Sequence, residues 1–218
     1  MKFLKFTLLL VAIASLTGCA SGYDSITPKS LNYASVNVKD GVKLEYKYDL
    51  LDKKYEKKED KRGVKLVAVS ITNTSERDLI FGKDLTLSYE NGDYVPLMEY
   101  DKTFKSLRQS PLTHLFYLLL TPLNLHITKA SSSGNIVTNS YPIGLLLGPG
   151  IAGGNMIAAS TANGKFKKDL MEYNLQGTMI KKGETKYGLI GINTDSYDAL
   201  QPVVKNASEA ETKKEIAP

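Results

Sequence analysis

The sequence predicts a mainly β protein that carries a helical insertion of unusually low charge. Residues 42–48 alternate apolar and charged side chains with a period of two, which is typical of a half-buried strand. Residues 64–72 are apolar or β-branched at nearly every position, as in a central strand buried on both faces. Residues 109–164 contain a single formal charge, Lys129, although 23% of the whole chain is charged. A length of 218 residues suits one domain with a large insertion.

The composition excludes several classes of protein. A hydrophobic content of 42% is too high for a disordered chain, and no uninterrupted apolar run reaches the roughly 20 residues that a polytopic membrane protein needs. A single cysteine rules out an internal disulfide framework and a zinc site built on several thiolates. The net charge of +5, which falls to +3 without Lys2 and Lys5, does not argue for nucleic acid as a partner.

The N-terminus predicts a secretory signal peptide over residues 1–18. Lys2 and Lys5 form a basic end, and residues 7–15 are almost wholly apolar. The uncharged stretch ends too soon to span a bilayer of roughly 30 Å as a permanent helix. We therefore expect residues 1–18 to be removed from the mature protein.

The end of this segment, Leu16-Thr17-Gly18-Cys19, resembles the lipobox of bacterial lipoproteins. The resemblance implies cleavage between Gly18 and Cys19, a diacylglycerol on the Cys19 sulfur and an acyl chain on the new amine. Lipidation at Cys19 would anchor the protein to a membrane. The alternative is a simple signal peptide that is cut elsewhere and leaves Cys19 as a free thiol.

The residues after the cysteine bear on location. Enterobacterial lipoproteins with Asp in the second place stay at the inner membrane, and this chain has Ala20 and Ser21 instead, which implies the outer membrane. Only Asp24 is acidic nearby, which favours the periplasmic face over surface export. Residues 19–35 are rich in small and polar side chains and predict a lipidated flexible tether.

The body of the protein is expected over residues 36–204. Asn91-Gly92 between two alternating runs predicts a hairpin, and Pro96 places the following strand at a sheet edge. Further strands are predicted near the C-terminus, over residues 175–180, 185–192 and, more weakly, 197–204. Residues 52–62 are densely charged and predict a solvated loop. Residues 205–218 predict a disordered tail.

Three segments of this body resemble immunoglobulin-like domains of secreted bacterial lipoproteins. They are VKLVAVSITNTS at 64–75, YENGDYV at 89–95 and MIKKGETKYGLIGI at 179–192. The resemblance implies an immunoglobulin-like antiparallel β-sandwich, interrupted by the helical insertion at about residues 99–174. Because these motifs are common to many sandwiches, they bear on fold and not on activity.

The insertion predicts helices with breaks. Ser110-Pro111 predicts a helix start. Pro149 should divide the second apolar run, residues 143–160, so that only residues 150–162 form one helix. Asn163-Gly164 should end that helix. Gly144/Gly148 and Gly150/Gly154 have the spacing that lets helices approach closely.

Three interpretations of residues 109–164 stay open. The segment could pack on the sandwich or on itself, it could dock a partner or self-associate, or it could enter the bilayer. The proline and glycine content favours helices docked against protein over a membrane span.

Catalytic and metal-binding patterns are nearly absent. A metal site would need carboxylates beside His114 and His126, and residues 102–168 contain none. The sequence therefore predicts a non-enzymatic, lipid-anchored cell-envelope protein without a cofactor, which acts as a binding or scaffold module for an unknown envelope protein. A membrane-inserting or pore-associated lipoprotein is the alternative, and a hydrolase of envelope polymers is a further one.

Overall fold

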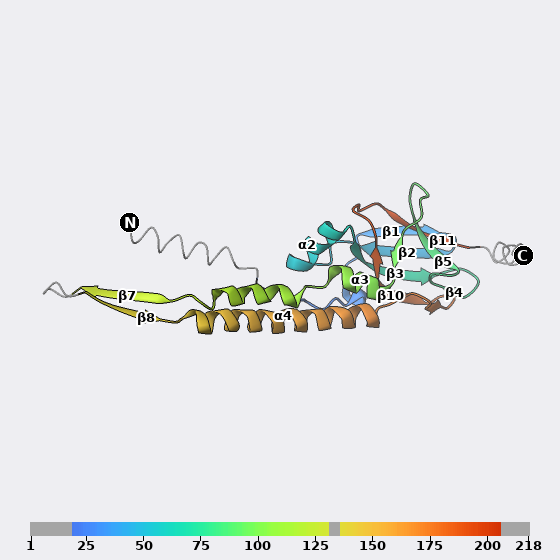
Figure 1. Ribbon diagram of the computed structural model, residues 1–218. Helices are drawn as coiled ribbons and strands as arrows, with labels where there is room; N and C mark the ends of the chain where they lie inside the picture. The colour runs from blue at the N-terminus through green and yellow to red at the C-terminus, as the bar shows by residue number, and fades with distance from the viewer. Residues whose placement is uncertain (1–18, 131–135, 206–218) are drawn as a thin grey trace, which may run out of the picture. The chain divides into compact units, whose positions relative to one another are not determined.

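The computed structural model describes residues 19–130 and 136–205, so the predicted signal peptide and all but Lys205 of the predicted tail lie outside the described residues. The chain forms two compact units (Figure 1). Unit 1 contains residues 19–22 and Gln109–Asn163. Unit 2 contains Tyr23–Arg108 and residues 164–205.

Unit 2 is built on a five-stranded antiparallel sheet in the order β1-β2-β3-β10-β6. The strands are β1 (Ser35–Lys39), β2 (Val42–Lys47), β3 (Lys65–Asn73), β10 (Thr185–Ile192) and β6 (Leu97–Met98). The prediction that residues 64–72 form the central strand is confirmed, because β3 pairs with β2 on one side and β10 on the other. The edge position predicted from Pro96 is also confirmed, since β6 closes the sheet.

Two shorter antiparallel pairs complete the strands of unit 2. They are β4 (Leu79–Ile80) with β9 (Met179–Ile180), and β5 (Leu85–Tyr89) with β11 (Leu200–Val204). The Asn91-Gly92 turn forms, with Gly92 at φ +91° and its N–H donating to the Tyr89 carbonyl at 2.9 Å. The hairpin is short, because the chain leaves β5 after one bridge between Ser88 and Tyr94. The next strand, β6, pairs with β10 instead.

One apolar core joins these strands. Val67, Val69 and Ile71 of β3 are fully buried, and they belong to a cluster that also takes residues from β2, β4, β5, β9, β10 and β11. The alternation predicted for residues 42–48 is confirmed in β2, whose apolar positions are buried and whose charged positions are half-exposed. Burial of this shared cluster is the main stabilising contribution to unit 2.

The predicted loop at residues 52–62 is wrong, because most of it forms helix α2 (Lys53–Arg62). Tyr55 and Glu59 lie one turn apart on the helix and are both buried, whereas the remaining charged side chains face outward. Gly63 ends the helix in the left-handed conformation, at φ +60°. A helix with two inward positions looks like a charged loop in sequence, because its apolar stripe is too narrow to produce a clear period.

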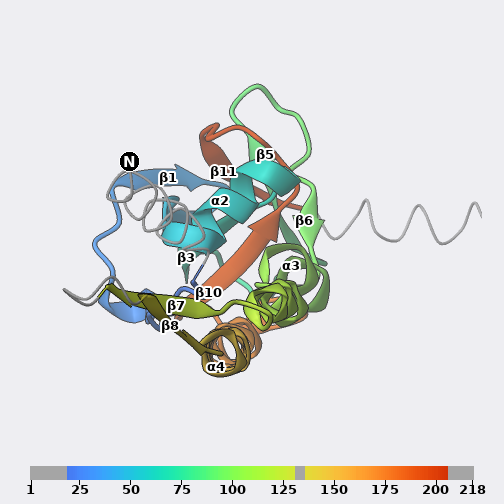
Figure 2. The same cartoon turned by 60° about the vertical axis from the view of Figure 1, so that its left-hand side comes forward.

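Besides α2, unit 2 contains two further helices and the C-terminal end of helix α4 (Gly144–Glu172). The short 3₁₀ helix η1 (Pro28–Ser30) precedes the sheet, and α3 (Tyr100–Leu107) follows β6. α2 lies beside α3 and the start of β3 (Figures 1 and 2). Gly191 of β10 lets α3 approach the sheet, since a Cβ there would overlap the Thr103 side chain.

Residues 23–35, expected to belong to a flexible tether, pack on unit 2. The Tyr23 hydroxyl and the Ile26 N–H both donate to one carboxylate oxygen of Asp169, at 3.0 and 2.8 Å, and all three residues are buried. The Tyr23 ring also contacts the rings of Tyr55 and Phe166. Composition alone suggests a linker here, but a hydroxyl and a backbone N–H that share the Asp169 carboxylate, together with the buried Tyr23 ring, hold the segment.

Unit 1 is not purely helical, so this part of the fold-class prediction is corrected. Its elements are the 3₁₀ helix η2 (Pro111–Leu120), a hairpin of β7 (Leu125–Ala130) and β8 (Ile136–Tyr141), and most of helix α4 (Gly144–Glu172). The helix start at Ser110-Pro111 is confirmed, although the helix is of the 3₁₀ type. The described chain contains about as much helix as strand, so the mainly β expectation holds only in part.

The two predicted breaks in α4 are wrong, because the helix is continuous from residue 144 to residue 172. Pro149 lies in the second turn, where it removes one hydrogen bond close to the helix start without ending the helix. The Asn163 side chain, which would otherwise compete with the helical backbone, is engaged by the backbone of Gln109.

Candidate functional site

The candidate site begins at Cys19, which is exposed and has no disulfide partner. The two residues that follow it are hydrogen-bonded within unit 1. The Ala20 N–H donates to Asn155 Oδ1 of α4 at 2.6 Å, and the Ser21 N–H donates to Gln109 Oε1 at 3.1 Å. Cys19 is therefore held one residue away from the middle of α4, while its sulfur remains accessible.

Gln109 organises this attachment. Its side chain binds both the N–H and, through Nε2 at 2.7 Å, the carbonyl of Ser21. Its own backbone N–H and carbonyl bind the Asn163 side-chain amide, each at 2.9 Å. Gln109 and Asn163 are the first and last residues of the inserted part of unit 1, so this pair closes the base of the insertion.

Large apolar side chains are exposed on every element of unit 1. Of the 22 large hydrophobic residues that are exposed in the described chain, 15 belong to this unit. We call these 15 residues the apolar surface: Leu112, Leu115, Phe116, Leu118, Leu119, Leu123, Leu125, Ile127, Ile136, Val137, Tyr141, Leu145, Leu146, Leu147 and Ile157. Phe116 is 74% exposed and Leu146 is 81% exposed. The expectation that the apolar runs of residues 109–164 are covered by protein does not hold for these side chains.

The β7–β8 hairpin has two chemically different faces. Directly opposed residues of an antiparallel pair share a face, so Leu125, Ile127, Val137 and Tyr141 lie together, with Lys129 and Asn139. The other face carries His126, Thr128, Thr138 and Ser140, with Ala130 and Ile136. The hydroxyls of Thr128 and Thr138 are hydrogen-bonded across it at 3.1 Å. All twelve strand residues are exposed, and both outer edges of the pair lack a neighbouring strand among the described residues.

The two glycine pairs of α4 differ in what they contact. A Cβ on Gly144 would overlap the carbonyl oxygens of Leu120 and Thr121, and one on Gly148 would lie 2.7 Å from Thr121 Oγ1. The close approach predicted from this pair is therefore confirmed, against the end of η2. A Cβ on Gly150 or Gly154 would meet nothing within 4 Å, so no described part of the chain uses the second pair.

The histidines do not form a site together. The His114 side chain is buried and its ring is stacked on Tyr117, with 6.1 Å between centroids, whereas His126 is exposed on the hairpin. Across residues 19–130 and 136–205, no three His, Cys, Asp or Glu side chains gather closely enough to hold a metal ion. None of the described helices combines the length and the apolar character needed to cross a membrane.

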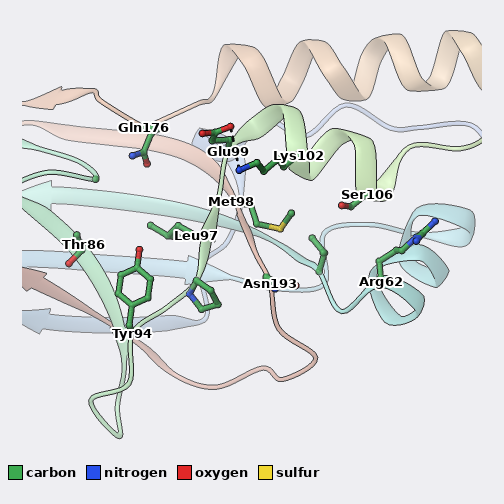
Figure 3. A pocket seen from close by; sticks show the side chains of 13 residues that line it. Arg62, Thr86, Tyr94, Leu97, Met98, Glu99, Lys102, Ser106, Gln176 and Asn193 are labelled. Atoms are coloured by element: carbon green, nitrogen blue, oxygen red, sulfur yellow. Dashed lines mark ion pairs between the residues drawn. The ribbon is translucent and has the colours of Figure 1, made fainter.

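Unit 2 has an open cleft of about 650 Å³ beside the edge strand β6 (Figure 3). Charged side chains of both signs line it, with Arg62 from α2 and Glu99 and Lys102 at the start of α3. Figure 3 shows Glu99 and Lys102 side by side, and their charged atoms are 3.9 Å apart. Tyr94 and Ser106 add hydroxyl groups. This mixed lining suits a polar partner surface.

The same cleft bears on the hydrolase alternative. That hypothesis expects several acids to converge with a tyrosine or serine, and among the residues that the structure describes Glu99 is the one carboxylate that lines the cleft. The lining therefore offers hydroxyl groups without a second acid beside Glu99 to share acid and base roles.

Sequence reasoning identified Cys19 and the low-charge segment but not the residues that connect them. Asn155 is a polar residue in the apolar run of α4, and that isolation is a signal by which it could have been found. Gln109 and Asn163 have polar neighbours in the sequence and carry no such signal. The hairpin could have been suspected from the β-branched residues around Ser131-Ser132-Ser133-Gly134-Asn135.

No family model, no curated protein and no solved structure matches this chain.

Proposed function

We propose that this chain is a non-enzymatic lipoprotein of the bacterial cell envelope, anchored through Cys19 and acting as a binding or scaffold module. The observation that carries the proposal is the position of the only cysteine, directly after Leu16-Thr17-Gly18 and a short apolar run with a basic start. Its exposure in the structure supports the proposal, because the acylating enzyme must reach the sulfur. The residues after Cys19 favour the outer membrane and its periplasmic face.

Unit 2 is the proposed binding module. We propose that it follows the plan of an immunoglobulin-like sandwich, supported by a core that the five-stranded sheet shares with β5 and β11. The cleft beside β6 is the proposed contact site for an envelope protein, because it is open, polar and bounded by a sheet edge.

The anchor is tested by the substitution Cys19→Ala. Metabolic labelling with a palmitate analogue should mark the wild-type chain and not the variant, and the variant should accumulate unprocessed. Equal labelling of both chains would show that the lipid is not on Cys19.

The binding role is tested by photocrosslinking in cells. A photoreactive residue at Ser106, in the cleft, should give a discrete adduct with one envelope protein. The matched control is Lys39, an exposed residue of β1 at the opposite edge of the same sheet. Adducts of equal yield at both positions, or at neither, would contradict a partner in the cleft.

A further inference from the structure

We propose that the apolar surface of unit 1 inserts into the lipid of the leaflet that holds the Cys19 anchor. The occupant of the surface is then the acyl-chain and headgroup boundary of a phospholipid monolayer. The inference deepens the proposed function and rests on it, because the anchor is what brings unit 1 to the membrane.

The first argument is the place of attachment. Acyl chains on Cys19 must lie within the bilayer, and the next residue is hydrogen-bonded to Asn155 at 2.6 Å. No flexible spacer therefore separates the anchor from α4. Leu146 lies nine residues before Asn155 on the same helix, which is about 14 Å along the axis. That distance is comparable with the thickness of one leaflet's hydrocarbon layer, roughly 15 Å.

The second argument is charge. Residues 109–164 carry one formal charge, Lys129, while 15 large apolar side chains of this unit are exposed. Interfaces between proteins usually keep a polar rim around their apolar centre, and monomers rarely expose apolar patches this extensive to water. A surface that is both apolar and nearly uncharged over four consecutive elements matches lipid better than a second protein.

The third argument is the two-faced hairpin. Leu125, Ile127, Val137 and Tyr141 can face the acyl chains, and the long side chain of Lys129 on the same face can extend its amine to the headgroups. The hydroxyl-bearing face then meets water and headgroups. The unpaired strand edges would be costly in the hydrocarbon centre, where nothing satisfies their N–H and carbonyl groups. The hairpin therefore lies along the boundary of one leaflet, which is the behaviour of a monotopic element.

The test uses the lipidated full-length protein in phospholipid vesicles. Because lipidation blocks the Cys19 thiol, a cysteine introduced elsewhere is the only one that a fluorophore can label. Phe116→Cys and Leu146→Cys probe the apolar surface, and Val38→Cys, an exposed apolar position of unit 2, is the control. His126→Cys and Ile127→Cys are neighbours on opposite faces of the hairpin and form a second matched pair. All five positions are exposed, so the fold should tolerate the changes.

The proposal predicts opposite responses to two quenchers. Nitroxides on the lipid acyl chains should remove most of the fluorescence at residues 116, 127 and 146 and little at residues 38 and 126. Aqueous iodide should do the reverse. Iodide quenching at residue 146 as strong as at residue 38 would overturn the proposal. Protection from both quenchers, together with a disulfide between copies through residue 146, would overturn it in favour of self-association.

Failure of the proposed function gives a different result. If Cys19 carries no lipid, the chain without an added cysteine takes up the thiol-reactive fluorophore, whatever the quenchers report. Labelling of that chain therefore tests the anchor, and quenching at residues 116, 127 and 146 tests the insertion.

Discussion

Glu59 is a carboxylic acid with almost no access to water. It lies on the inner side of α2, is 3% exposed, and accepts the Leu66 N–H at 2.6 Å. Burial raises its pKa to about 7, because the charged form loses hydration that the Leu66 N–H and the nearby Lys65 replace only in part. The hydrogen bond joins α2 to β3, so this one side chain couples a helix to the central strand.

The raised pKa of Glu59 predicts a stability that falls as pH rises. The folded chain holds this proton up to about pH 7, whereas the unfolded chain releases it near its ordinary pKa of 4.5. Glu59 therefore contributes about 3 kcal/mol to the free energy of unfolding below pH 4.5, and this contribution is lost as pH rises through 7. Glu59→Gln keeps an acceptor oxygen without the charge and should remove this component.

Urea unfolding of wild type and Glu59→Gln between pH 4.5 and 8 measures the effect. The stability of the wild type relative to the variant should fall across this range. Glu90→Gln, at an exposed glutamate, is the control and should leave the wild-type slope unchanged. Parallel pH profiles for wild type and Glu59→Gln would contradict the assignment.

Buried polar contacts at single residues also decide where the N-terminal segment lies. Asp169 accepts hydrogen bonds from both the Tyr23 hydroxyl and the Ile26 N–H. Burial, with the Asp169 carboxylate beside it, raises the pKa of the Tyr23 hydroxyl, so Tyr23 remains a donor at any physiological pH. A segment that looks like a linker is thereby held in unit 2 from Tyr23, the fourth residue after Cys19, onward.

At the scale of elements, α4 shows that the same residue type has opposite roles along one helix. Gly144 lies against the last carbonyl groups of η2, whereas Gly150 has no neighbour among the described residues within 4 Å of where a Cβ would be. The first glycine permits contact between two elements, and the second lowers the stability of the helix without a packing gain from the described part of the chain.

This contrast predicts opposite effects of two alanines. Gly144→Ala forces η2 and α4 apart and should destabilise unit 1 by about 1–3 kcal/mol. Gly150→Ala should stabilise the helix by up to about 1 kcal/mol. Amide hydrogen exchange across residues 144–157 measures both, with faster exchange expected in the first variant and slower exchange in the second. Equal protection in the two variants would show that the contact with η2 is not tight.

At the scale of the whole molecule, the inserted part of unit 1 begins and ends at one point. The backbone of Gln109 is within 2.9 Å of the Asn163 side chain, so the two ends are close enough to be joined directly. Unit 2 has its own core, to which none of the described residues between 109 and 163 contributes. Insertions with this geometry are removable from many domains.

Replacing residues 110–162 with a short Gly-Ser linker should therefore leave unit 2 folded. Thermal unfolding should remain cooperative, and the amide NMR spectrum should stay dispersed. In the unlipidated Cys19→Ala background, the shortened chain should also require no detergent to remain monodisperse. A molten or aggregated product would show that unit 2 depends on the insertion.

Much of unit 2 was predictable from local patterns. The period of two in β2 and the β-branched run of β3 are patterns of neighbouring side chains. The edge position after Pro96 follows from the N–H that proline lacks. Each of these is a property of a few adjacent residues. The α2 helix was missed because only Tyr55 and Glu59 point inward, and burying a glutamate depends on the Leu66 N–H of another element.

The sequence by itself determined the possible anchor, the low charge of residues 109–164 and the central strand, because each is a property of composition or of neighbours along the chain. Only the tertiary structure decided that Ala20 binds Asn155, that the apolar side chains of unit 1 are exposed, and that α4 continues through Pro149 and Gly164. These facts depend on contacts between residues as many as 135 positions apart. Burial and hydrogen bonding at such separations are set by which elements meet, and local periodicity carries no information about that.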